Sequence, residues 1–199
     1  MSTSLSAAYR SRSSRRLARF AGPVAATVTI GSILLATALS PTFDWGTSAL
    51  SDLGTVGATG WLFNGGLIGG CLLGLPYGWA LWTAAADQLG NIRVATFLTA
   101  LLSMAGVGLF PAGDPLHLPF ALAFFVFAAL TLIVDGVARF RLPGGKLSLA
   151  AGIASPAVWP FWLLVVSPDG GIAVPEFVGA AFFALWIVGL SPERPGRAS

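Results

Sequence analysis

Six long hydrophobic runs constrain this chain more than any other feature. They cover residues 20–39, 60–84, 94–109, 116–138, 147–166 and 174–190. A helix needs about 20 apolar residues to cross a hydrocarbon core of roughly 30 Å. Turn residues such as Pro, Gly, Asn and Asp separate the runs, and only the segment 41–59 is longer than a hairpin connection. The pattern predicts an all-α membrane protein, a bundle of six transmembrane helices.

The composition agrees with a lipid environment. Of 199 residues, 55% are hydrophobic and only 10% are charged, and the mean hydropathy is +0.81. A soluble domain carries roughly a quarter charged residues, so this chain cannot cover a surface that faces water. This argues against a soluble enzyme and against a nucleic-acid partner. Cys71 is the only cysteine, so the chain can form no internal disulfide and no cysteine-based metal site.

The positive residues predict the orientation, because Lys and Arg in short loops stay on the cytoplasmic side. All eleven fall in the two terminal tails and in the second and fourth connections: Arg10, Arg12, Arg15, Arg16, Arg19, Arg93, Arg139, Arg141, Lys146, Arg194 and Arg197. Both termini are therefore expected in the cytoplasm. We divide the chain into a basic, flexible cytoplasmic tail (1–19), a six-helix transmembrane domain (20–190) and a second cytoplasmic tail (191–199).

The first hydrophobic run has two other interpretations. Ala36-Thr37-Ala38 resembles the cleavage site of a signal peptide, and Arg15-Arg16 resembles a twin-arginine signal. A run of about 19 apolar residues exceeds the usual 7 to 15 of a signal peptide, and no folded soluble domain follows that would need twin-arginine export. Whether the first span is cleaved stays open, and we favour a retained helix.

Glycines recur every four residues along the second span, at Gly66, Gly70, Gly74 and Gly78, and Gly65 and Gly69 widen the stripe. Small residues at this spacing lie on one helix face and allow a neighbouring helix to approach closely. The stripe is open to three interpretations, as a hinge, a dimer interface or a packing seam inside the bundle. We favour packing inside the bundle.

Most charges near the spans have simple structural interpretations. Asp135 and Arg139 are four residues apart and form an expected ion pair on one helix face. Asp87 and Arg93 are interpreted as loop charges. Glu176 follows Pro175 in the first turn of the last span, where the positive end of the helix dipole favours an acidic residue.

The first outer loop has the pattern of a short interfacial helix. Thr47 or Ser48 can cap the helix, Gly54 can end it, and Leu50 and Leu53 lie on one face. On the same side of the membrane, Asp114-Pro115 is typical of a helix cap followed by proline at the first helical position, which puts the only histidine in the first turn of the fourth span. Polar side chains in lipid are costly and mark candidate sites. The candidates on this side are Ser51, Asp52, Asn64, Asp114 and His117.

These residues carry a resemblance to a known family. Three short motifs resemble those of the six-span prokaryotic membrane proteins grouped as domain of unknown function 998. They are Ser51-Asp52-Leu53-Gly54 after the first span, Phe63-Asn64 in the second, and Phe110-Pro111 before His117. Haloarchaeal members of that family are the most similar in these motifs. The resemblance covers about residues 20–190 and implies a six-helix fold without a mechanism. Through the Ser-Asp-x-Gly loop, the chain is also remotely similar to six-span eukaryotic autophagy modulators and lipid-remodelling proteins, which points toward lipid handling.

Three functions stay open. The first is a non-catalytic protein of the cell membrane that binds lipid or a partner through an outer polar site containing Asp52, Asn64, Asp114 and His117. The second is a membrane-embedded hydrolase or transferase that acts on a lipid headgroup with Ser51, Asp52 and His117. The third is a small transporter. The lack of acidic or basic residues at the bilayer midplane argues against it.

We expect membrane lipids as partners, and a second copy of the chain as a further partner. We expect no cofactor and no metal, because one histidine and no usable cysteine cannot supply the three ligands of a typical catalytic zinc site. The sharpest expectation is that Asp52 and His117 approach each other at the outer mouth, with Ser51 beside them and Asn64 beneath. The alternative is that Asp52 accepts backbone N–H groups of its own loop and His117 is an ordinary residue at a helix start.

Overall fold

The computed structural model describes residues 2–167 and 170–195, and their side chains from Ser14 onward. These residues form helices and connecting loops, in chain order α1 (Ser2–Leu39), the 3-10 helix η1 (Leu50–Thr55), α2 (Gly57–Thr83), α3 (Gln88–Leu109), α4 (His117–Ala138), α5 (Pro143–Phe161), α6 (Ala173–Leu185) and two π-helical turns, η2 (Trp162–Val166) and η3 (Trp186–Leu190), which continue α5 and α6. Six of these helical segments are long and apolar enough to cross a membrane. The predicted six-helix membrane bundle is confirmed.

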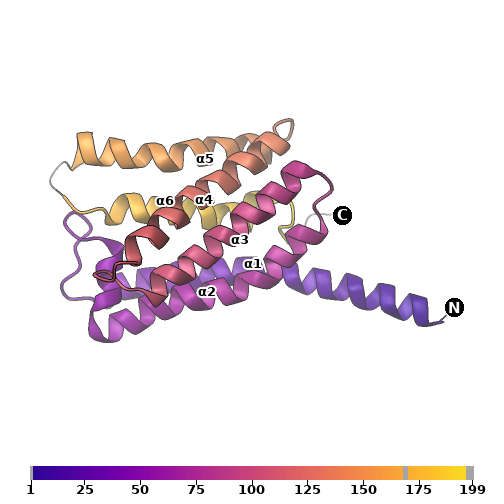
Figure 1. Cartoon of the computed structure of the whole chain (residues 1–199), viewed down its shortest axis with the longest axis horizontal. Coiled ribbons are helices and arrows are strands. Elements are labelled where there is room, and N and C mark those ends of the chain that lie inside the picture. Colours follow the sequence, from indigo (N-terminus) through magenta and orange to yellow (C-terminus); the bar gives the residue numbers. More distant parts are fainter. Residues whose placement is uncertain (1, 168–169, 196–199) are drawn as a thin grey trace.

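Both ends of the chain lie at one end of the bundle (Figure 1). The loops that precede α2, α4 and α6 lie at the opposite end. We call these the inner and the outer end. From the positions of the Lys and Arg residues, we expect the inner end to be cytoplasmic.

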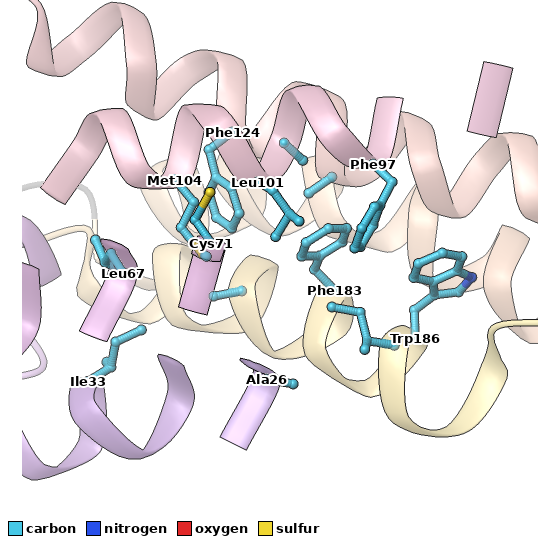
Figure 2. Close-up of a cluster of buried hydrophobic side chains, with 14 of the residues drawn as sticks. Ala26, Ile33, Leu67, Cys71, Phe97, Leu101, Met104, Phe124, Phe183 and Trp186 are labelled. Atoms are coloured by element: carbon cyan, nitrogen blue, oxygen red, sulfur yellow. The ribbon is translucent and has the colours of Figure 1, made fainter. Parts of the chain in front are cut away.

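Consecutive helices from α1 to α5 pack side by side, and α6 contacts α1, α4 and α5. The core lies between these helices, as Figure 2 shows. Toward the inner end, aromatic rings pack around Phe97, whose centroid lies 5.6 Å from that of Phe183 and 5.9 Å from that of Trp186. Only 11% of the most hydrophobic 18-residue stretch of the fifth span is buried, so other helices cover this span least.

The glycines of α2 face two neighbouring helices. A Cβ atom at Gly66 or Gly70 would collide with Ser32 or Thr29 of α1. A Cβ atom at Gly74 would lie 2.9 Å from Leu101 of α3, and one at Gly78 would lie 2.5 Å from Leu98. Gly65 and Gly69 face open space. The four glycines at the fourfold spacing therefore allow close packing within the chain.

Two predicted helix starts are wrong by one or two residues. Ala49, and not Thr47 or Ser48, is the residue before η1, and η1 continues one residue past Gly54 to Thr55. The residue before α4 is Leu116, because Asp114 forms a turn ahead of the helix. The Asp114 carboxylate accepts the N–H of Leu116 at 2.8 Å in this turn. The helix then begins at the histidine that the sequence places in its first turn.

Helix α1 extends back to Ser2, through the segment that the sequence analysis treats as a tail. Two arginines fasten its inner half to the bundle. Arg15 donates to the carbonyl oxygen of Thr83 at the end of α2, at 3.2 Å, and Arg19 forms an ion pair with Glu193 at 2.7 Å. Part of the basic segment therefore contacts other helices.

The orientation can be tested with single cysteines in a Cys71→Ser background. Thr42 is exposed at the outer end and Gln88 is exposed at the inner end. We expect Thr42→Cys to react with a membrane-impermeant thiol reagent on intact cells, and Gln88→Cys to react only after the cells are opened. The reverse labelling pattern would contradict cytoplasmic termini.

Candidate outer-face site and an inner charge cluster

A small cavity opens at the outer end of the bundle, where η1 meets α4 and α6. Its volume is about 50 Å³, which is room for a few water molecules. Three polar side chains line it near the outer end: Ser51, His117 and Glu176. Deeper in the bundle, the lining is largely apolar and comes from five helices, with Ile33, Leu67, Met104, Phe124 and Ala180 among its residues. The cavity therefore has a polar mouth and an apolar floor.

Glu176 joins the outer loop to the last helix. Its side chain is 8% exposed, and its Oε2 atom accepts the backbone N–H of Leu50 at 2.6 Å. The sequence places this acid correctly in the first turn of α6, but the helix dipole does not reveal its contact with a loop 126 residues away. The available signal was the presence of an acid inside an apolar span, which by itself marks a candidate site.

His117 has a defined hydrogen-bonding role. Its Nδ1 atom lies 2.8 Å from the carbonyl oxygen of Phe110, which can only accept. Nδ1 must therefore carry the proton, and in the neutral ring Nε2 keeps its lone pair. The imidazole thus brings an acceptor to the residues around the cavity.

Asp52 and Asp114 interact with their own loops. The carboxylate of Asp52 accepts the N–H of Ala49 at 2.8 Å, at the start of η1, and the side chain is exposed. Asp114 is exposed and accepts from Leu116. Neither residue is among those that line the cavity. A shared ligand between Asp52 and His117 stays a prediction.

Asn64 lies at a second outer feature. Its Nδ2 atom donates to the carbonyl oxygen of Gly54 at 2.9 Å, and its buried Oδ1 atom has no partner among the described residues. The side chain lines a groove of about 490 Å³ together with Trp61, Ile68 and several glycines of η1, α2 and α3. The structure therefore places Ser51 and His117 at one cavity and Asn64 at another groove.

A buried charge cluster occupies the inner half of the bundle, and Asp135 is its centre. This side chain is fully buried, and its carboxylate forms ion pairs with Arg139 and Arg93. The carboxylate also accepts the hydroxyl of Ser148 at 2.7 Å and the indole N–H of Trp186 at 2.8 Å. One acid thus connects α3, α4, α5 and η3.

The interpretation of Arg93 as a loop charge is wrong. Arg93 belongs to α3, is 6% exposed, and donates from Nη1 to Asp135 at 3.2 Å. Its Nε atom is buried without a partner among the described residues. The expected pair between Asp135 and Arg139 is present, but it is one part of a cluster that crosses the bundle. Sequence spacing reveals partners on the same helix and not those on another helix.

A family model for a protein of unknown function (DUF998) matches residues 21–191, which is most of the chain. The chain belongs to this family. No curated protein and no solved structure matches it. The resemblance to the family, including its six-span fold, is confirmed, and the family description adds no activity.

The side chains at the mouth of the outer cavity offer hydrogen-bonding groups. In the part of the chain that the structure describes, no group of three or more His, Cys, Asp or Glu side chains is placed to hold a metal ion. The cavity instead combines a carboxylate, an imidazole acceptor and a hydroxyl around an apolar interior. Such a site fits an amphipathic ligand whose polar end donates hydrogen bonds.

Proposed function

We propose that this protein binds a lipid of the cell membrane, without catalysis, at its outer cavity. One observation supports the proposal most directly: Ser51, His117 and Glu176 come from three separate elements to the polar mouth of one apolar cavity. Binding sites for small molecules have this character, with a mostly apolar lining and a few placed polar groups.

The polar groups favour a particular end group. Glu176 supplies carboxylate oxygens and His117 supplies Nε2, and both are acceptors, whereas Ser51 can donate or accept. A ligand that brings donors, such as a hydroxyl or amine group, matches these acceptors. A volume of about 50 Å³ limits what enters to a small end group. Glycerol-type and ethanolamine-type headgroups meet both conditions, with the rest of the lipid outside in the bilayer.

The proposal is tested by the lipids that remain bound during purification. Glu176→Gln keeps an acceptor for the N–H of Leu50 but replaces the other carboxyl oxygen with an amide donor, and His117→Ala removes the free acceptor. Leaving a buried hydrogen-bonding group without its partner costs about 1–3 kcal/mol, so we expect roughly a tenfold loss of the retained lipid by mass spectrometry for Glu176→Gln.

Asp114→Asn is the matched control, because Asp114 is exposed at the same end and does not line the cavity. It should retain lipid as the wild type does. An unchanged lipid profile in both cavity variants, with folding intact, would contradict the proposed site.

Hydrolysis or group transfer on a lipid headgroup is a second candidate, favoured by the joint presence of Ser51 and His117 at the cavity. An imidazole with a free Nε2 can act as a general base toward a hydroxyl nucleophile. The candidate requires turnover of lipid in vesicles that is lost in Ser51→Ala and in His117→Ala. Retention of intact lipid with no product would favour binding alone.

A further inference from the structure

An apolar groove runs along the inner half of the bundle, on the side of α5 that faces α6. It has a volume of about 500 Å³. Small residues form one part of its lining, and leucines and a phenylalanine form the other: Ala150, Ala151, Ala154, Gly189, Leu147, Phe182, Leu185 and Leu190. From Leu147 to Ala154 the groove follows α5 for about 10 Å, roughly a third of the hydrocarbon thickness.

The inner end of this groove is cationic. Lys146 directly precedes Leu147, and its Nζ atom lies 5.8 Å from the centroid of the Phe140 ring. The carbonyl oxygen of Leu190 accepts from Nη2 of Arg139 at 2.7 Å and from Nη1 of Arg194 at 3.5 Å. Three positive side chains thus lie at or next to the point where the groove reaches the membrane surface.

The acids near this end are already paired. Asp135 is bound by Arg93 and Arg139, and Glu193 is bound by Arg19. Among the described residues, neither Lys146 nor Arg194 forms an ion pair with a carboxylate. The N-terminus of α5 begins at Pro143 and adds a positive dipole end at the same level. The charge that remains uncompensated at this end is positive.

We propose that this groove binds the acyl chain of an anionic phospholipid of the cytoplasmic leaflet, with the phosphate held beside Lys146 and Arg194. The apolar lining matches the chain, and the cations match the headgroup. A basic residue near the membrane surface attracts anionic lipid, and an adjacent apolar groove converts that general attraction into a site. This site is separate from the outer cavity and faces the other leaflet.

A second copy of the chain fits the groove less well. Two copies related by a twofold axis along the membrane normal would place the same surface against itself. Lys146 and Arg194 of each copy would then approach their equivalents without an acid to compensate them. The charge pattern therefore favours an anionic lipid.

The experiment measures phospholipid retention by native mass spectrometry of the full-length protein. Protein is equilibrated with mixed vesicles of phosphatidylglycerol and phosphatidylcholine that carry the same acyl chains. We expect preferential retention of phosphatidylglycerol. Lys146→Gln should weaken it about fivefold, which corresponds to one surface cation. Ala150→Leu should also reduce it, because Ala150 is exposed and the larger side chain fills the groove.

Two matched variants separate the groove from the general lipid shell. Arg141→Gln removes an exposed charge at the inner end outside the groove, and Ala157→Leu adds the same bulk on an exposed position of α5 beyond it. Both should retain phosphatidylglycerol as the wild type does. Equal retention of the two lipids by the wild type would overturn the proposal. Equal losses in the groove variants and in their controls would overturn it as well.

Discussion

Replacing Asp135 with alanine is expected to destabilise the bundle by about 3–5 kcal/mol. The substitution removes the only acid of the buried cluster and leaves the charges of Arg93 and Arg139 without a partner. The hydroxyl of Ser148 and the indole N–H of Trp186 also lose their acceptor. A lone buried charge costs far more than a complete ion pair contributes. The cluster connects α3, α4, α5 and η3, so its loss weakens the contacts among all four elements.

Thermal unfolding in detergent measures this effect, and a charge-free cluster provides the control. In the triple variant Arg93→Met, Asp135→Leu and Arg139→Met, no buried charge remains, and apolar side chains of similar length occupy the space. Its stability should lie well above that of Asp135→Ala. A wild-type melting temperature for Asp135→Ala would show that the cluster does not hold the helices together.

Gly70→Leu is expected to have the second-largest effect, a loss of about 3 kcal/mol or a changed packing of α1 on α2. A single Cβ atom at this position already collides with Thr29 and lies 3.4 Å from the carbonyl oxygen of Ala25. Overpacking a close contact commonly costs 1–3 kcal/mol and sometimes more. A branched side chain cannot fit unless the two helices separate.

Gly65→Leu is the matched control on the same helix, because nothing lies within 4 Å of a Cβ atom at Gly65. Its stability in detergent should stay within about 0.5 kcal/mol of the wild type. Equal destabilisation by both substitutions would indicate a loss of helix flexibility that does not depend on the neighbour. Equal stability of the wild type and Gly70→Leu would contradict the close contact with α1.

The sequence predicts the helices of this fold well because lipid imposes simple rules. A backbone in hydrocarbon must satisfy its own hydrogen bonds, so each long apolar run must become a helix. The runs ending at Leu39 and Leu109 end at those residues in the structure. Helix starts are less predictable, since Asp114 and Ser48 can form turns as well as caps. The structure resolves this competition in favour of turns.

The site is less predictable, because its residues meet through tertiary packing. His117 and Ser51 were candidates from their polarity and their side of the membrane, and both line the outer cavity. The sequence predicts only a local role for Glu176, although its carboxyl group accepts the N–H of Leu50 in η1, 126 residues away along the chain. Arg93 illustrates the same limit at the inner end. Hydropathy gives the depth of a residue, but which helix it faces depends on the rotation of every helix in the bundle.

The contacts of residues 186–194 have a consequence for biogenesis. Trp186 and the carbonyl of Leu190 join the Asp135 cluster, Ser191 bonds to Tyr77 of α2, and Glu193 bonds to Arg19 of α1. These residues are synthesised after the first five helices. Until they are in place, Asp135 lacks the indole N–H of Trp186 and Arg19 lacks its partner Glu193. The first five helices therefore complete their buried polar contacts only when this segment packs against them.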